Sequence, residues 1–352
     1  MSSFRSRRKR RIAFFDRGNA SYINSDLRLL MAHCDVVRCS FHARSAFQLS
    51  IGLIKQLFHA IKIIPRSDVV FVHFAGWNSI IPLIVGRFCK KRTILFIHGT
   101  DAVSFPSIRY GNFSKQPLAS VTCMSLKLAR QIVAVDRSLI SSVNTFATEE
   151  PIEQGIAFHC RHLRTPSIVI PHGFDPDQWP LGDSIRDIDV ITVALELHQE
   201  WRRQLKGVDL LITAARMMPD RKFVVIGSGV IPDLPPNVIS MAELPLEDMI
   251  KWYQRSKIYA QLSMSEGFGC ALAEAMLCGC IPIVSNVGAM PAIVGEAGNV
   301  VRSRNAQELR MNLTKYLDLW QPDLKFDPRE RIATNYQLKG REQRLIALLN
   351  EN

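Results

Sequence analysis

Two glutamates beside a glycine-rich turn carry the strongest chemical signal in this sequence. Glu266 precedes Gly267-Phe268-Gly269, and seven residues separate Glu266 from Glu274. Glycines let a backbone approach a ligand closely, and the free amides at the start of a helix attract a phosphate. A carboxylate can accept two hydrogen bonds from ribose hydroxyls, each contributing roughly 1.5–3 kcal/mol. The pattern therefore favours a nucleotide site; in the structural alternative, Glu266 caps the helix and Glu274 is solvated.

This turn lies between an apolar run over residues 258–262 and a helix-forming run over 270–278. Other apolar runs have the same strand-like character: 12–15, 69–74, 93–97, 132–135, 168–170, 190–194, 223–226, 238–240 and 281–284. Continuous apolar strands are buried on both faces, and their alternation with helical segments, such as 126–130 and 207–217, predicts parallel sheets. Ligands bind beyond the carboxyl ends of such strands, which is where the turn falls.

The strands form two series, and a chain of 352 residues is long enough for two cores. A polar, turn-rich stretch over 175–183 separates the two series. The sequence thus predicts an α/β protein with two Rossmann-like, doubly wound domains. We expect an amino-terminal domain over residues 1–178, a carboxyl-terminal domain over 179–328 and a final helix over 329–352.

Composition indicates a folded protein with an uneven charge. Residues 1–175 contain 24 Lys and Arg against 10 Asp and Glu, whereas the remainder contains 20 against 22. The first half is therefore expected to meet an anionic partner. No uncharged run predicts a membrane span, and the start of the chain does not fit a signal peptide. Eight cysteines without paired or zinc-site spacing indicate reduced thiols in a cytosol.

Two segments of the basic half have the character of membrane-binding elements. Residues 5–11 are polybasic, and residues 47–64 place apolar side chains at helical spacing around Lys55, His59 and Lys62. Such a helix can lie in an anionic membrane interface. In the alternative interpretation it is an ordinary core-facing helix with a solvated edge. A nucleic-acid partner is not expected, because no binding motif or aromatic-studded basic groove accompanies the charge.

The segment from Glu266 to Met276 resembles the E-G-F-G-x-x-x-x-E-A-M signature of the retaining GT-B glycosyltransferases, family 4 (group 1) in particular. Other segments resemble family motifs in the same order: Phe96-Ile-His-Gly-Thr-Asp101, Val169-Ile-Pro-His-Gly-Phe-Asp175, Lys206-Gly-Val-Asp-Leu-Leu211 and Val224-Val-Ile-Gly-Ser-Gly229. The similarity is strongest from about residue 168 to residue 301.

The resemblance implies a GT-B fold, with two domains facing across a cleft and the final helix packed on the first domain. It implies metal-independent, retaining transfer of a hexose-type sugar from a nucleotide-diphosphate sugar, UDP or GDP, without another cofactor. If the basic first half meets a membrane, the expected acceptor is a glycan or lipid-linked saccharide of cell-surface polysaccharide or lipopolysaccharide synthesis. The expected protein is cytoplasmic and peripheral on the inner face of the cell membrane.

Residue roles follow from the same resemblance. Glu274 is expected to hold the ribose hydroxyls, and Glu266 to contact the donor sugar. Lys206 and the amides of Gly267, Phe268 and Gly269 are expected to neutralise the diphosphate, because fixed positive groups must meet the charge on the leaving oxygens. His98 is expected to face the junction of donor and acceptor.

The sequence departs from the family pattern near the diphosphate. Ala194-Leu195-Glu196 stands where the family has an arginine, and we expect Arg202 or Arg203 to supply the missing charge. The loop over residues 16–19 has one glycine in place of two, and Gly18 is expected to contact the donor.

Two other functions remain open at this stage. A sugar-nucleotide epimerase of the same fold needs no acceptor, and a catalytically silent nucleotide-binding relative is suggested by the missing arginine. The acidic pairs Asp175/Asp177 and Asp187/Asp189 resemble a metal–diphosphate site. Because both pairs fall in the predicted linker, we expect them in turns or on the surface.

Overall fold

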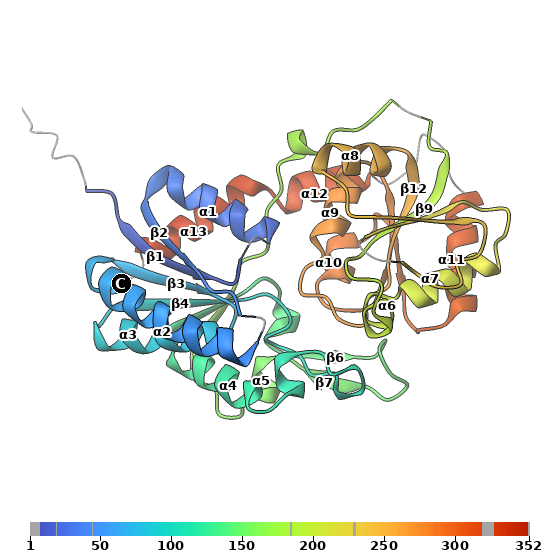
Figure 1. Cartoon of the computed structure of the whole chain (residues 1–352). Helices are drawn as coiled ribbons and strands as arrows, with labels where there is room; N and C mark the ends of the chain where they lie inside the picture. The colour runs from blue at the N-terminus through green and yellow to red at the C-terminus, as the bar shows by residue number, and fades with distance from the viewer. Residues whose placement is uncertain are drawn as a thin grey trace, which may run out of the picture. The chain divides into compact units, whose positions relative to one another are not determined.

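The computed structural model describes residues 8–18, 20–43, 45–183, 185–227, 230–318 and 327–350. These residues fall into two compact units (Figure 1). Unit 1 draws on the described residues within 1–141, 154–171 and 339–352, and unit 2 on those within 142–153 and 172–338. The chain therefore enters unit 2 for residues 142–153, enters it again at residue 172 and returns to unit 1 at residue 339. The sequence instead predicts a single boundary at residue 178 before the carboxyl-terminal domain.

Unit 1 is built on a parallel six-stranded sheet with the order β2-β1-β3-β4-β5-β8. Its strands are β1 (Arg11–Asp16), β2 (Asp35–Ser40), β3 (Val69–His73), β4 (Arg92–Ile97), β5 (Gln131–Ala134) and β8 (Ser167–Val169). Its helices are α1 (Ser21–His33), α2 (Ala46–Ile63), α3 (Trp77–Phe88), α4 (Leu118–Leu128), α5 (Ile156–His159) and α13 (Leu338–Asn350). Helices α1 and α13 cover one face of the sheet, and α2 and α3 cover the other (Figure 1).

Unit 2 contains a second parallel six-stranded sheet, in the order β11-β10-β9-β12-β13-β14. Its strands are β9 (Ile188–Val193), β10 (Phe223–Ile226), β11 (Val238–Met241), β12 (Ser256–Gln261), β13 (Ile281–Ser285) and β14 (Asn299–Val301). Its helices are α6 (Glu200–Lys206), α7 (Val208–Arg216), α8 (Leu246–Gln254), α9 (Cys270–Leu277), α10 (Met290–Val294), α11 (Ala306–Asp318) and α12 (Pro328–Asn335).

Short elements complete the chain. A two-stranded sheet joins β6 (Ser142–Asn144) to β7 (Ile152–Gln154). Single 3₁₀ turns are η1 (Ile64–Arg66), η2 (Pro106–Ile108), η3 (Asn112–Ser114), η4 (Arg137–Leu139) and η5 (Pro176–Gln178). Every strand expected from a continuous apolar run is present. Strands β2, β6, β7 and β14 carry no apolar run that predicts them, and the helix predicted over 126–130 overlaps only the last turn of α4.

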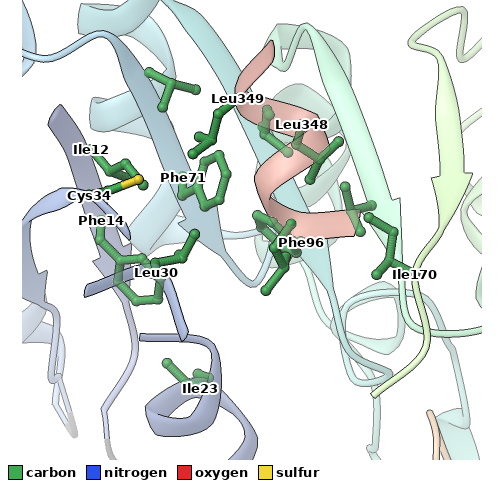
Figure 2. Packing of buried hydrophobic residues seen from close by; sticks show 14 residues of the cluster. Ile12, Phe14, Ile23, Leu30, Cys34, Phe71, Phe96, Ile170, Leu348 and Leu349 are labelled. Carbon is green, nitrogen blue, oxygen red and sulfur yellow. The ribbon is translucent and has the colours of Figure 1, made fainter. Parts of the chain in front are cut away.

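The core of unit 1 includes the end of the described chain. Leu345, Leu348 and Leu349 of α13 pack with Phe71 and Phe96 of the sheet in one buried cluster (Figure 2). A buried ion pair accompanies this packing, because the Arg341 guanidinium donates to both carboxylate oxygens of Asp26 in α1, at 2.5 and 2.6 Å. The same guanidinium donates to the carbonyls of Ile170 and Pro171.

The expectation that all cysteines are reduced is wrong for one pair in unit 1. Cys123 in α4 and Cys160 after α5 form a disulfide, and their Cα atoms lie 5.4 Å apart, within the ordinary range for such a bond. The two residues are 37 positions apart in the sequence. That separation carries no local spacing signal, so the pairing becomes visible only when the fold brings α4 and α5 together.

One helical stretch among the described residues, 46–66, is long and apolar enough to cross a membrane when judged by length and composition alone. It comprises α2 and η1, and only 17% of its most apolar window is buried inside the protein. The sequence predicts no membrane span at this position. Length and composition are weak criteria for one helix, so its packing and charges decide how it is interpreted.

Removing Arg341 is expected to destabilise the protein strongly. Arg341→Met leaves the buried Asp26 carboxylate without its charge partner, which costs about 3–5 kcal/mol of unfolding free energy. Urea denaturation measures this loss, and Arg344→Met, on the exposed side of α13, is the matched control. The double variant Asp26→Leu/Arg341→Met leaves no buried charge and should recover part of the loss. A double variant no more stable than Arg341→Met contradicts this account.

Candidate functional site

The topology of unit 2 places its site at a single point on the sheet edge. Strand β9 is central, and the chain runs outward from it in one direction through β10 and β11 and in the other through β12 to β14. Helices that leave neighbouring strands β9 and β12 must therefore diverge to opposite faces, which opens a crevice at the carboxyl ends of these strands. Residues 194–206 follow β9, and residues 262–269 follow β12, so the two expected site segments meet there.

The Glu266 carboxylate is held in this crevice by three polar groups. The Lys206 ammonium lies 2.9 Å from its Oε2 atom, the Gln261 amide donates to the same oxygen at 2.8 Å, and the Ser263 hydroxyl donates to it at 3.4 Å. The ion pair is only partly shielded, since both side chains retain some exposure to solvent. Glu266 therefore stays fixed at one oxygen, and its side chain remains accessible for a ligand hydroxyl.

A close contact between backbones sets the position of Lys206. Gly207 ends α6 in the left-handed region, with φ of 67°, and a Cβ atom there would lie 2.1 Å from the carbonyl oxygen of Leu262. The amide of Met264 donates to the carbonyl of Leu205 at 2.8 Å. Only glycine permits this approach, which brings the end of α6 against the loop that carries Glu266.

The glycine turn after Glu266 directs α9 into the site. Gly269 has φ of 101° and caps α9, so the amides at the start of this helix have no intrahelical carbonyl partners. The Phe268 ring is buried against the rings of His172, Phe174 and Tyr336, with centroids 5.3, 6.0 and 5.5 Å away. Phe268 therefore anchors the turn with its side chain and offers a ligand only its backbone, as Gly267 and Gly269 do.

Glu274 lies one turn inside α9. Its surroundings raise the pKa of its carboxyl group from an ordinary value of 4.5 to about 7, because burial disfavours the charged form. Among the residues that the structure describes, none donates a hydrogen bond to this carboxyl group. A ligand that brings two hydroxyl donors would supply the bonds that a carboxylate needs at this position.

The two arginines expected at the diphosphate have partners outside the Glu266 cluster. Arg202 pairs with Glu196 at 2.5 Å and stacks over the Trp201 ring, while Arg203 donates to the carbonyl of Leu197 at 2.8 Å. In the described structure, no hydrogen bond or ion pair joins either arginine to Glu266 or to the glycine turn. The Val224–Gly229 motif is described as far as Gly227, and Ser228 and Gly229 lie outside the described residues.

The Asp16 carboxylate organises the loop that follows β1 in unit 1. Asp16, at the end of β1, accepts a hydrogen bond from the Gly18 amide at 2.8 Å and from the Arg38 guanidinium at 2.6 Å. Gly18 has φ of 118°, and a Cβ atom there would lie 2.6 Å from the His42 ring. Gly18 is therefore placed at the carboxyl edge of the unit 1 sheet, where its single glycine permits a tight turn.

His98 follows β4 and is nearly buried. Its Nε2 atom lies 3.0 Å from Nδ1 of His73, which ends β3, and burial lowers the pKa of His98 to about 3. The Asp101 carboxylate accepts backbone amides from His98, Gly99 and Ala75, each at 3.0 Å. This cradle fixes the turns after β3 and β4, while burial keeps His98 a neutral imidazole at ordinary pH.

A cavity of about 300 Å³ opens at the same edge of unit 1. Loops after β1, β2 and β3 contribute to its wall, together with the first turns of α2 and α4. The lining is largely apolar, with one cation: Arg17, Phe41, Ala43, Ser45, Ala46, Leu49, Gly76, Trp77, Asn78 and Leu118. Its aromatic and cationic character suits a sugar ring carrying a negative charge.

Some members of these clusters were not expected from the sequence. Gln261, Ser263 and His73 belong to residue types that are common in ordinary strands and turns, and only their positions at strand ends could have marked them. The expectation that the acidic pairs lie in turns or on the surface is confirmed for Asp175, which caps η5, and for Asp187, which pairs with Arg255 and Lys222. It is wrong for Asp189, because β9 begins at Ile188 and holds this residue buried, paired with Lys257. Among the described residues, no group of three or more His, Cys, Asp or Glu side chains is arranged to hold a metal ion.

Residues 202–337 match the family described as glycosyl transferases group 1. This part of unit 2 is similar to the group 1 glycosyltransferases. The match begins at Arg202 in α6 and includes Lys206, Glu266, the glycine turn and Glu274, so it covers the crevice described above. The resemblance found in the sequence is thereby confirmed for this part of the chain.

The chain is also similar to individual glycosyltransferases. It is 27% identical over 221 residues to the D-inositol 3-phosphate glycosyltransferase of Mycobacterium sp. (strain JLS), which covers 56% of this chain and 46% of that protein. It is 29% identical over 127 residues to the lipopolysaccharide core biosynthesis mannosyltransferase LpcC of Rhizobium leguminosarum bv. viciae, covering 35% and 34%. The matched region thus spans less than half the length of either curated relative.

A solved structure matches nearly the whole chain. Anabaena HepE, solved in complex with UDP-glucose, superimposes with a TM-score of 0.67 at 14% identity, covering 97% of this chain and 99% of that one. Together with the two parallel α/β sheets, this likeness identifies the GT-B fold, as predicted.

The raised pKa of Glu274 predicts a characteristic dependence of stability on pH. The folded state binds this proton more tightly than the unfolded state between pH 4.5 and about 7, so the free energy of unfolding falls as pH rises through that window. The expected fall is on the order of 1–3 kcal/mol. Glu274→Gln removes this contribution, whereas Glu247→Gln, on the exposed side of α8, retains it. Denaturation curves measured from pH 4.5 to 7.5 test the difference, and identical slopes in both variants would contradict the assignment.

Proposed function

We propose that this protein is a retaining glycosyltransferase that moves a hexose-type sugar from a nucleotide-diphosphate sugar to an acceptor hydroxyl. The observation that carries the proposal is the Glu266 carboxylate, held by Lys206 and Gln261 beside the amides that begin α9. One crevice thus offers a sugar-binding acid, a cation and free backbone donors. Glu274 adds a carboxyl group whose hydrogen-bonding capacity is open to a ribose.

The charges of this crevice suit departure of a nucleotide diphosphate. During transfer, the bond from the sugar carbon to the diphosphate breaks, and its electron pair moves to the leaving oxygen. The Lys206 ammonium and the amides of residues 267–269 stabilise that oxygen, which is the role that a metal ion has in other enzymes. The acceptor oxygen forms the new bond on the same face, and its proton passes to the departing phosphate. We assign UDP or GDP as the nucleotide and no further cofactor.

The acceptor is assigned to unit 1, with the 300 Å³ cavity as its binding pocket. The assignment of His98 to the junction of donor and acceptor rests on the family resemblance. A glycan or lipid-linked saccharide of cell-surface polysaccharide or lipopolysaccharide synthesis agrees with the lipopolysaccharide core role printed for the Rhizobium relative. It also agrees with the basic character of the first half of the chain, which suits an anionic partner. We place the protein in the cytoplasm, peripheral on the inner face of the membrane.

A silent nucleotide-binding role is the second candidate, and one observation favours it. Glu196 lies in the segment where the family has an arginine. Its ion pair with Arg202 neutralises a cation that would otherwise be available to the diphosphate. A silent relative binds a nucleotide sugar without breaking its glycosidic bond. Product analysis with and without a saccharide acceptor separates this role from transfer, and from epimerisation, which proceeds without an acceptor.

Donor binding is tested by thermal shift with UDP-, GDP-, ADP- and TDP-sugars. A ligand present at 100 times its Kd stabilises the native protein by about 2.7 kcal/mol, which raises Tm by several degrees. We expect one nucleotide class to stabilise the wild type and the Glu247→Ala control, and Glu274→Ala to lose most of that shift. An unchanged shift in Glu274→Ala would remove the ribose assignment.

Turnover is tested at the cluster around Glu266. Lys206→Met removes the charge that stabilises the leaving diphosphate, and loss of one such donor lowers kcat by about 10²–10³-fold. Lys251→Met, on the exposed side of α8, is the control and should retain full activity. Normal turnover in Lys206→Met would contradict the proposed role.

A further inference from the structure

Helix α2 in unit 1 presents a continuous apolar stripe to solvent. Phe47 and Phe58 are 75% and 70% exposed, and three isoleucines between and beyond them are also exposed: Ile51, Ile54 and Ile61. Successive members are four, three, four and three residues apart, which is the spacing that aligns side chains along one helix face. Large aromatic and β-branched side chains lie outside the core over the whole length of the helix.

The opposite face of α2 fixes the helix to unit 1. Gln56 and Ala60 are buried, and the Gln56 amide donates to the backbone carbonyl of Asn78 in α3 at 2.7 Å. A helix whose buried face packs on a neighbouring helix and donates a buried hydrogen bond to it is a component of the domain. We therefore interpret the stripe as a surface of unit 1 that lies on a partner, rather than as a segment that spans a membrane.

The charge around the stripe has one sign. Lys55 and Lys62 are exposed and seven residues apart, so they lie on one flank of the stripe, with His59 between them. No Asp or Glu occurs between residues 36 and 67. Across residues 36–135 there are 13 Lys and Arg but only two acids, one of which, Asp101, is fully buried.

The end of α3 also presents an exposed aromatic side chain flanked by cations. Phe88 is 84% exposed and stands in the sequence Arg87-Phe88-Cys89-Lys90-Lys91. Helix α3 contacts η1, which follows α2 directly, so this second exposed aromatic with adjacent cations belongs to the same side of unit 1. Apolar side chains flanked only by cations are the combination that an interface of anionic lipids favours.

We propose that the α2 face, defined as Phe47, Ile51, Ile54, Phe58 and Ile61 with Lys55 and Lys62, lies in the interface of an anionic phospholipid membrane. The rings and isoleucines enter the acyl boundary, and the lysines contact lipid phosphates. A second copy of this chain is disfavoured as the occupant, because two such faces would bring their lysines together. The docking itself does not depend on the proposed transferase activity.

The position of α2 deepens the proposed function, on which this step rests. Ser45, Ala46 and Leu49, at the start of α2, line the 300 Å³ cavity that we assign to the acceptor. Phe47 of the stripe stands in the same helical turn. A lipid-linked acceptor could therefore place its headgroup in the cavity while its tail remains in the bilayer beside α2.

Flotation of the full-length protein with vesicles tests the proposal. We expect the wild type to float with vesicles of 30% phosphatidylglycerol in phosphatidylcholine and to bind phosphatidylcholine alone at least tenfold more weakly. Ile54→Glu/Phe58→Glu should lose at least tenfold in binding, since it places two acids in the stripe. Lys55→Glu/Lys62→Glu should lose binding to the anionic vesicles selectively. Met31→Glu changes an equally exposed apolar residue on α1, across the sheet, and should bind as the wild type does.

Three results overturn the proposal. They are absence of wild-type binding, equal binding by the α2 variants, and a dimer in light scattering that the α2 variants dissociate while vesicle binding is absent. The thermal shift with nucleotide sugars separates this test from the proposed function. Each α2 variant should keep the wild-type shift, which shows that it is folded, and Glu274→Ala should keep vesicle binding. Failure of one measurement therefore leaves the other interpretable.

Discussion

The ion pair between Glu266 and Lys206 is the interaction on which the candidate site depends. A carboxylate at the mouth of a buried strand needs a nearby cation and donors, and Lys206, Gln261 and Ser263 provide them. Lys206 can reach only because α6 ends against the β12 loop, where the backbone carbonyl of Leu262 leaves no space for a side chain at residue 207. The geometry of a single glycine thus positions the charge that a diphosphate would meet.

The two units stabilise the loops at the carboxyl edges of their sheets with different groups. Each has a parallel sheet in which neighbouring strands lead to helices on opposite faces, so each has one edge where loops can diverge. Unit 2 stabilises that edge with an ion pair that is partly open to solvent. Unit 1 stabilises it with the buried Asp101 carboxylate, which accepts three backbone amides and fixes the turns beside His98. The first arrangement can exchange partners with a ligand, whereas the second is a rigid support.

Buried strands could be predicted from the sequence, because they are continuous apolar runs. Contacts between residues far apart in the chain could not be predicted, because they leave no local pattern. Continuous apolar runs identify ten strands of the two sheets, because parallel strands are covered on both faces. Strand β2 is missed because Arg38 interrupts its apolar run, and β14 because it contains only two apolar residues. The glycine turn identifies the start of α9. Gln261 and Ser263, which bind Glu266, and His73, which lies beside His98, were not predicted. Their residue types are common in strands and turns, and only the fold shows which side chains they contact. The disulfide between Cys123 and Cys160 was not predicted for the same reason.

The return of α13 to unit 1 has a consequence for the order in which the protein can mature during translation. Asp26 and Arg341 are 315 positions apart, and the carboxylate lies in the interior of the first unit to emerge from the ribosome. Until Arg341 has been added, that unit holds an uncompensated acid and lacks the leucines that close its hydrophobic interior. Unit 2, whose segments lie between these two positions, is synthesised in the meantime. The nascent amino-terminal half therefore remains incomplete until its last helix is synthesised. During this interval its hydrophobic interior is exposed, and a chaperone would have the largest surface to bind.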